Sequence, residues 1–325
     1  MQKVLRIGTR DSQLAVWQAT LVQRLLRENS VLSELVYIKS EGDVDTVTPL
    51  YALGVTGIFT KTLDTALLNN KIDVAVHSMK DVPTQMASGI QQSAVLKRGP
   101  HKDILVLHPE HCERKEVNTL SIEVDKYLEQ GGHVIATSSV RRIAQWQRRY
   151  PNCQIENLRG NVNTRLRKLK ESNWLGAIFA AAGLERINLR PENSIDLDWM
   201  LPAPAQGAIM VVCRENDDYT WQSCKPLNDE ETALCTKIER DFLRGLMGGC
   251  STPISALAEV VRGKVEFQGN VVSADGLHIA ECFESKPVAD AHGLGFAAAA
   301  SVLSAGGQAI LEALRKKGLT ANEEV

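Results

Sequence analysis

Arginine is concentrated in one stretch of this sequence. Arg141 and Arg142 follow a Thr-Ser-Ser tripeptide at the predicted end of a strand, where the next helix offers free backbone N–H groups and its positive dipole end. Arg159 and Arg165 stand at the following strand-to-helix junction. Because a guanidinium stays charged and binds carboxylates through two parallel hydrogen bonds, these residues predict a small polyanionic ligand that carries carboxylates or phosphates.

Other readings of the arginines stay open. Arg148, Arg149 and Arg167 are equally typical of a solvated helix face. The sequence contains neither a Walker loop nor a GxGxxG motif, which disfavours a nucleotide. Single-stranded nucleic acid is disfavoured too, because only Trp146 and Tyr150 could offer stacking surfaces among the basic residues.

Two further segments could do chemistry. Lys80-Asp81 follows a predicted strand of small apolar residues, and Asp81 is either a turn residue or a carboxylate that moves a proton and stabilises a developing cation. Gly248-Gly249 follows the predicted end of a helix and turns the chain sharply before Cys250. Cys250 is either a buried structural residue or a thiol that forms a covalent bond.

Composition limits the class of protein. The chain has 325 residues, of which 44% are hydrophobic and 23% charged, typical of a globular protein with two or three domains. With 37 Lys and Arg against 39 Asp and Glu, the net charge of -2 provides no overall basic field for nucleic acid. We expect no transmembrane helix and no secretory signal. The seven cysteines are scattered without a CxxC pair, which predicts no metal site and reduced thiols in the cytoplasm.

The pattern of strands and helices must position these residues. Strands at 3–8, 34–38 and 72–76 alternate with helices from about 12 and at 58–69, and a similar set covers 103–181. This alternation predicts parallel βαβ units, with ligands at the carboxyl ends of the strands. We expect the strand within 201–214 to return to the first unit. A helix at 229–247, three strands within 256–283 and a helix at 295–317 predict a small α+β module.

Seven ordered motifs resemble the porphobilinogen deaminase (hydroxymethylbilane synthase) family. They are TRDSQLAVWQA (9–19), VHSMKDVP (76–83), TSSVRR (137–142), LRGNVNTRLRKL (158–169), AAGLERI (181–187), LPAPAQGA (201–208) and ERDFLRGLMGGCSTPIS (239–255). The resemblance implies an α/β protein of three domains. Two α/β domains like type II periplasmic binding proteins, at 1–102 plus 204–224 and at 103–203, flank a cleft, and a small α+β domain covers 225–325.

The resemblance also implies a reaction. Four porphobilinogen molecules condense head to tail with loss of ammonia, and the linear tetrapyrrole hydroxymethylbilane is released. A dipyrromethane cofactor, built from two porphobilinogen units, is held by a thioether to Cys250. Asp81 matches the family's catalytic carboxylate, which assists departure of ammonia and stabilises the resulting cation. We also expect a cytoplasmic monomer whose partner is its small-molecule substrate, without nucleic acid or membrane.

The remaining site residues are carried over from the family's motifs. The resemblance implies that the cofactor is held by Lys80, Ser12, Arg141, Arg142, Thr137, Ser139 and Phe59, besides Cys250. It implies that the substrate is bound by Arg10, Gln18, Arg159, Arg165, Arg186 and Gln206. Three features depart from the family pattern: the lid segment 46–59 has an atypical sequence, KTLD at 61–64 replaces the common KELE, and Ala205 replaces a glycine. The alternative function is a two-domain polyanion-binding protein without catalysis.

Overall fold

The computed structural model describes residues 3–39, 58–111, 124–249 and 252–316. Its first sheet contains β1 (Leu5–Thr9), β2 (Ser33–Tyr37), β3 (Val74–Ser78), β4 (Ile90–Leu96) and β10 (Ile209–Arg214), in the order β2-β1-β3-β10-β4. β1, β2 and β3 are parallel, as predicted, whereas β10 runs antiparallel to both of its neighbours. Helix α1 (Gln13–Glu28) packs on one face of this sheet and α2 (Ile58–Leu68) on the other.

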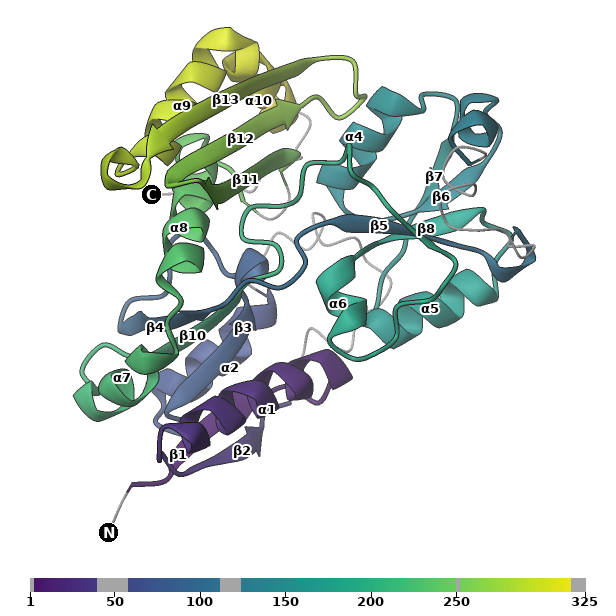
Figure 1. Ribbon diagram of the computed structural model, residues 1–325. Helices are drawn as coiled ribbons and strands as arrows, with labels where there is room; N and C mark the ends of the chain where they lie inside the picture. The colour runs from purple at the N-terminus through teal and green to yellow at the C-terminus, as the bar shows by residue number, and fades with distance from the viewer. Residues whose placement is uncertain (1–2, 40–57, 112–123, 250–251, 317–325) are drawn as a thin grey trace.

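The second sheet repeats this plan. Its strands are β5 (Asp103–Leu107), β6 (Val134–Ala136), β7 (Gln154–Glu156), β8 (Gly176–Ala180) and β9 (Ser194–Asp196), in the order β7-β6-β8-β5-β9. Its helices include α4 (Val140–Arg149), α5 (Val162–Lys170) and α6 (Ala181–Glu185). The chain passes from β4 into β5 and returns from β9 into β10, so two crossovers join the first and second sheets (Figure 1).

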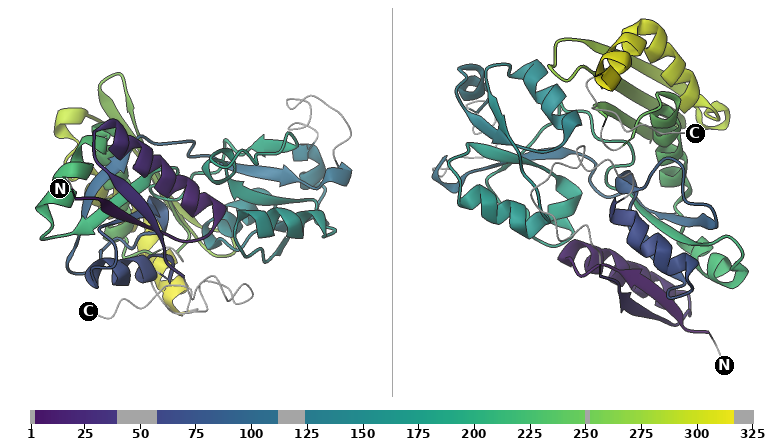
Figure 2. Two further views of the ribbon diagram at one scale, coloured as in Figure 1. Left: turned by 90° about the horizontal axis from the view of Figure 1, so that it is seen from below. Right: turned by 180° about the vertical axis from the view of Figure 1, so that it is seen from behind.

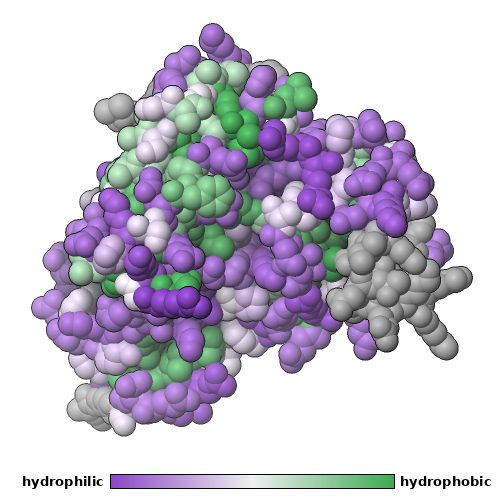
Figure 3. Space-filling view, turned by 45° about the horizontal axis from the view of Figure 1, so that its top comes forward, coloured by the Kyte–Doolittle hydropathy of each residue, from purple (hydrophilic) through white to green (hydrophobic). Residues whose placement is uncertain are grey.

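The third sheet is an antiparallel meander of β11 (Ile254–Val261), β12 (Lys264–Val272) and β13 (Ile279–Pro287). It packs against α8 (Glu230–Gly245), α9 (Leu294–Val302) and α10 (Gln308–Lys316), and α8 leads to it from the first sheet (Figures 1 and 2). The single helix predicted at 295–317 is interrupted by a wide turn, Leu303–Gly307, because Gly306 adopts a φ of 103°. Exposed apolar residues such as Phe283 and Phe296 belong to this part of the protein, where Figure 3 shows the largest apolar area.

One stretch, Leu294–Lys316, is long and apolar enough by length and composition to cross a membrane, although we expected no such segment. Core helices meet the same criteria. In this protein α9 and α10 bury Leu294, Ala298 and Leu311 in the core that they share with the third sheet.

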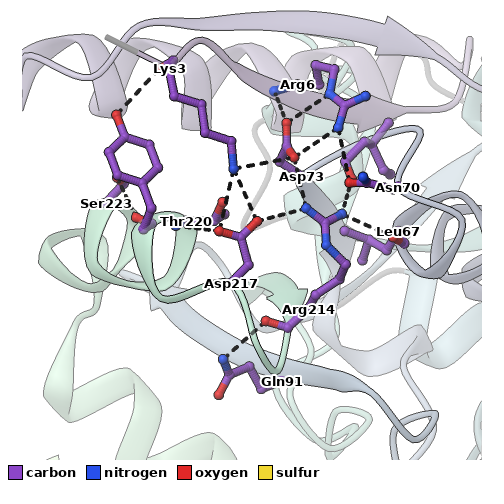
Figure 4. A network of polar contacts seen from close by, with 12 residues as sticks. Lys3, Arg6, Leu67, Asn70, Asp73, Gln91, Arg214, Asp217, Thr220 and Ser223 are labelled. Atoms are coloured by element: carbon purple, nitrogen blue, oxygen red, sulfur yellow. Dashed lines mark hydrogen bonds and ion pairs between the residues drawn. The ribbon is translucent and has the colours of Figure 1, made fainter. Parts of the chain in front are cut away.

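A polar network ties the returning strand to the end of the first sheet opposite the strand termini that carry Arg10 and Lys80 (Figure 4). Asp73 is paired with Arg6, Arg214 and Lys3, and Asp217 caps α7 (Asp218–Cys224) while it accepts from Arg214. Burial raises the pKa of Asp73, but the hydrogen bonds from Arg6 and Arg214 outweigh it and hold this pKa well below its usual range. The network therefore fixes β10 beside β3 and involves neither Arg10 nor Lys80.

The predicted strands and helices are present in the described residues, with ends shifted by a few residues. The prediction that β10 returns to the first sheet is confirmed. The sequence reading missed β4, β9, α6 and α7. Short elements such as β9 and α6, with three and five residues, offer too few positions for a periodic pattern.

Candidate functional site

Lys80 and Asp81 lie in a single 3-10 turn, Met79–Asp81, that continues directly from β3. Both side chains are half-buried, and the Lys80 ammonium donates to Gln206 Oε1 over 3.2 Å. Burial lowers the pKa of Lys80 to about 8, and the nearby charges of Arg142 and Arg141 act in the same direction. Asp81 is near enough to Lys80 and to Arg165 to raise the pKa of each. The turn therefore places one cation and one carboxylate beside the arginines of the second sheet.

Arg141 and Arg142 share a buried carboxylate, Asp103. Arg141 Nη2 lies 2.7 Å from Asp103 Oδ2, and Arg142 Nη2 lies 2.7 Å from Oδ1. The same arginines donate to the carbonyl oxygens of Leu201 and Ile178. Burial raises the pKa of Asp103, but Arg141 and Arg142 outweigh this effect and hold it well below its usual range. Asp103 therefore neutralises part of the positive charge of Arg141 and Arg142, which the sequence analysis predicted to bind a ligand.

Arg159 and Arg165 carry positive charge that is less well compensated. Arg159 is buried, and its Nη1 has no hydrogen-bond acceptor among the described residues. Arg165 Nε donates to the carbonyl oxygen of Gly160 over 2.7 Å. Burial lowers the pKa of Arg165 to about 10, and the charges of Arg142 and Arg159 add to this effect. A buried donor without an acceptor costs free energy, so an anion placed here would be stabilised.

We call the set Lys80, Asp81, Asp103, Arg141, Arg142, Arg159 and Arg165 the cationic site. Its members come from the end of β3, the start of β5, α4 and the β7–α5 region. Gln206 accepts from Lys80 and donates to Asp103, which pairs with both Arg141 and Arg142, so these groups lie together. The charges of Arg142, Asp81 and Arg159 also act on Arg165. With five cations and two carboxylates, the cationic site has an excess of positive charge that suits a polyanion.

Arg186 and Arg10 lie near this set. Arg186, just after α6, donates to the carbonyl oxygen of Gly207 over 2.6 Å and lies over the ring of Trp17. Burial lowers the pKa of Arg186 to about 10. Arg10 follows β1, and the β1–β3 register, continued by two residues, sets it beside His77. Both arginines thus lie where elements of the first sheet approach the second.

Several predicted site residues serve protein groups in this structure. Gln206 links the site internally, because its amide nitrogen donates to Asp103 Oδ1 and to the carbonyl oxygen of His101. Gln18 donates to the hydroxyl of Ser78 over 2.9 Å, and Ser12 caps α1. Thr137 Oγ1 accepts from the backbone of Ser139, the N-cap of α4. Direct ligand contacts of these five residues stay predictions.

Cys250 and segment 46–57 of the predicted lid lie outside the described residues. Phe59 belongs to α2, but its side chain is also outside them. The predicted helix end before Cys250 is confirmed, since α8 ends at Gly245. The turn was predicted at the two glycines, but Met247 is the residue that adopts the left-handed conformation, with a φ of 50°. Ala205 adopts a φ of 62°, the left-handed region that favours glycine, which explains why alanine is a departure at this position.

The sequence analysis missed two buried acidic residues and one histidine–aspartate pair. Asp103 is the first residue of β5 and is followed there by four apolar residues. Glu239 lies in α8, and its exposed fraction is 0%. An acidic residue embedded in an apolar strand or helix was the available signal, because such residues are buried only with partners. His77 Nε2 lies 3.6 Å from Asp64 Oδ1, and burial lowers the pKa of His77 to about 4 while it raises the pKa of Asp64 to about 6.

Among the described residues, no group of three or more His, Cys, Asp or Glu side chains could hold a metal ion. The excess of fixed cations in the cationic site favours a polyanion as its ligand.

Structural similarity to solved proteins is distant. The VFT2 domain of Bordetella pertussis BvgS covers 71% of this chain, with 90% of its own length matched, 12% identity and a TM-score of 0.39. A Salmonella typhimurium periplasmic binding protein with high arginine specificity covers 71%, with 94% of its own length matched, 12% identity and a TM-score of 0.40.

Sequence similarity is much closer. Residues 5–222 match the family described as porphobilinogen deaminase, dipyromethane cofactor binding domain, and residues 233–304 match the porphobilinogen deaminase C-terminal domain. A porphobilinogen deaminase of Syntrophotalea carbinolica is 40% identical over 95% of this chain and 96% of its own length. One of Acidithiobacillus ferrooxidans is 40% identical over 97% and 99%. With most of its length matched in this way, the chain belongs to the porphobilinogen deaminase family.

Proposed function

We propose that the family's reaction takes place at the cationic site, with Asp81 as its catalytic carboxylate. The family assembles a linear tetrapyrrole from porphobilinogen on a dipyrromethane cofactor, and the chain is a transferase of this kind. The observation that supports the proposal most directly is the cluster of charges around Asp81. Asp81 raises the pKa of Lys80 and of Arg165, and Arg142 lowers the pKa of both.

The charge of the substrate matches the cluster. Each porphobilinogen unit carries an acetate and a propionate, so every added unit brings two carboxylates. Arginine binds such groups through two parallel hydrogen bonds, and a low local dielectric strengthens the attraction. We therefore propose that Arg10, Arg159, Arg165 and Arg186 bind substrate carboxylates, with Gln18 and Gln206 beside them.

The residues present also fit the dipyrromethane cofactor. Its carboxylates need cations, and Lys80, Arg141 and Arg142 bring three cations together around the single carboxylate of Asp103. We propose that Lys80, Arg141 and Arg142 hold the cofactor, with Ser12, Thr137, Ser139 and Phe59, and that Cys250 attaches it. When bound, the cofactor supplies the pyrrole carbon to which the first substrate is joined.

Asp81 has a distinct task because it is the carboxylate of the Lys80-Asp81 turn. Loss of ammonia from porphobilinogen leaves a positive charge on the substrate. A fixed carboxylate stabilises that charge as it develops, and it can also hold the proton that the departing amine needs. Lys80 and Arg165 lie near this carboxylate, since its charge raises the pKa of each.

The proposal extends to the organisation of the chain. Each of the predicted domains, 1–102 plus 204–224, 103–203 and 225–325, contains one of the three sheets, and β10, within 204–224, belongs to the first. We propose a cytoplasmic monomer that binds neither nucleic acid nor membrane. The net charge of -2, which provides no overall basic field, supports the absence of nucleic acid. Sedimentation of the purified protein tests the monomer.

The test is Asp81→Asn, which keeps the shape of the side chain and removes its charge. We expect turnover of porphobilinogen to fall by about 10²–10³-fold, with the covalent cofactor retained in the intact mass. Asp198→Asn, on an exposed carboxylate paired with Lys102, is the matched control and leaves turnover unchanged. Wild-type turnover in Asp81→Asn would remove Asp81 from the mechanism. Cys250→Ser should lose the attached pyrroles, and their retention would move the anchor to another residue.

A further inference from the structure

The turn that carries Asp81 is held from outside by a side chain of α8. Arg240 donates to the carbonyl oxygen of Pro83 over 2.6 Å and to that of Val82 over 2.8 Å. A longer contact, 3.4 Å, reaches the carbonyl oxygen of Met79. These three carbonyl groups lie on both sides of Asp81 in the sequence, so a single guanidinium spans the segment that bears the carboxylate.

The chemistry of Arg240 suits this task. The end of a helical turn presents carbonyl oxygens without partners and carries partial negative charge, which a cation stabilises. A planar guanidinium has five N–H donors in fixed directions and can bridge several oxygens, whereas a lysine ammonium acts as a compact point charge. The other end of the turn is held by the first sheet, because Met79 N donates to the carbonyl oxygen of Ala208. Asp81 thus lies between two anchors, one from its own sheet and one from α8.

Helix α8 is itself fixed to the first sheet beside Arg240. The neighbouring residue, Glu239, forms a two-pronged ion pair with Arg98, at 2.6 and 3.1 Å. Its oxygens also accept from the backbone N–H groups of Ala205 and Ala258. Every oxygen of this fully buried carboxylate therefore has partners, so Glu239 sets the position of α8 against three segments of chain at once.

The same helix leads towards Cys250. α8 ends at Gly245, five residues after Arg240 and five before the cysteine. One rigid element therefore both holds the Asp81 turn and begins the segment that carries the predicted attachment point. Arg240 therefore links the Asp81 turn to the helix that precedes Cys250 in the sequence.

We propose that Arg240 is a positioning residue that holds Asp81 in its reactive place relative to the cofactor. The proposal rests on the proposed catalytic role of Asp81. Arg240 acts through the backbone of residues 79–83 and contacts no reacting atom in this account. A displacement of about 1 Å at a catalytic group can cost about 100-fold in rate, so the loss should appear in kcat and leave KM, which depends on the substrate-binding arginines, nearly unchanged.

The experiment is a double-mutant cycle on the holoenzyme with Arg240→Leu and Asp81→Asn. Steady-state kcat and KM for porphobilinogen are measured for both single variants and the double variant, with kcat expressed per cofactor-bearing molecule from the intact mass. We expect Arg240→Leu to lower kcat by about 10–100-fold. In the Asp81→Asn background the same change should have almost no further effect, because both substitutions remove the same contribution. Arg244→Leu, an exposed arginine one turn further along α8, is the matched control and should match wild type.

The outcomes separate the two proposals. Unchanged kcat per cofactor-bearing molecule in Arg240→Leu would overturn the positioning role, and so would a full additional loss in the double variant. A merely structural role of Arg240 predicts that additional loss. Wild-type kcat in Asp81→Asn alone would instead overturn the catalytic role of Asp81. If Arg240→Leu does not fold, Arg240→Lys takes its place in the cycle and should show the same pattern with a smaller loss, whereas a folded Arg240→Lys with wild-type kcat would overturn the proposal.

Discussion

Asp103→Asn tests how far one buried carboxylate holds the cationic site together. In the wild type, Asp103 is fully buried between Arg141 and Arg142, each at 2.7 Å and each nearly inaccessible to solvent. The amide of asparagine keeps the volume but brings its own N–H donors towards a guanidinium. Two buried cations would then lack their common counter-ion. Breaking a buried ion pair by removing one partner costs about 3–5 kcal/mol.

The assay is thermal and urea unfolding of Asp103→Asn beside wild type at pH 7. For a protein of this size about 2 °C of Tm corresponds to 1 kcal/mol, so we expect a decrease of roughly 6–10 °C. Asp198→Asn is the matched control: the same substitution removes an exposed partner of Lys102, at a cost of about 1 kcal/mol or less. Equal Tm values for the two variants would refute the inference that Asp103 is an essential counter-ion.

The pH dependence gives a second readout for Asp103. Because its folded-state pKa lies well below the unfolded value, its contribution is fully present above about pH 4 and is lost as the pH falls through the folded value. The difference in stability between wild type and Asp103→Asn should therefore be constant from pH 7 to pH 5 and shrink below about pH 4. A difference that grows on acidification would contradict the assigned pairing.

Two further predictions concern the same region. The first compares Cys250→Ser, which lacks the cofactor, with the double variant Cys250→Ser/Lys80→Met. The folded-state pKa of Lys80, about 8, lies below its unfolded value. The stability of Cys250→Ser relative to the double variant should therefore rise between about pH 8 and 10.5, by up to about 3 kcal/mol. Urea unfolding across this range checks the prediction, which a constant difference would contradict. Gly207→Ala should cost about 2–4 kcal/mol, because Gly207 has a φ of 88° and a Cβ would lie 2.7 Å from Gly99 O and 2.8 Å from Pro100 O. Gly132→Ala, with a φ of 79° but no described atom within 4 Å, should cost only about 1–2 kcal/mol by Tm, and equal losses would rule out the steric contribution.

Local patterns predicted the elements that carry the site. A short apolar strand followed by polar residues identified the ends of β1, β3 and β6. The helix predicted from about residue 12 is confirmed, since Ser12 is the N-cap of α1. The strand directions were less accessible. The βαβ pattern predicts parallel strands, whereas β5 and β10 run antiparallel because each enters the sheet from a crossover at the opposite end.

The motifs also overstated the charge that is free for a ligand. Arg141 and Arg142 were predicted as carboxylate-binding residues, and their shared partner is 38–39 residues away in the sequence. Arg159 Nη1, by contrast, is buried without an acceptor in the described part of the chain. Nothing in the spacing of the arginines distinguishes these two situations, because burial and pairing are decided by strands that meet only in the folded protein.

The sequence alone determined which side chains follow which strand, since a residue's place after a strand or at a helix start depends on its neighbours within about ten positions. It thereby located Lys80 and Asp81, the arginine-rich junctions and the glycines before Cys250. Only the tertiary structure decided that Asp103 lies between two arginines and that Arg240 holds the turn of Asp81 across about 160 residues of chain. The physical reason is that hydrogen bonds and ion pairs depend on distance in space, and the crossovers bring together segments whose separation in sequence carries no local signal.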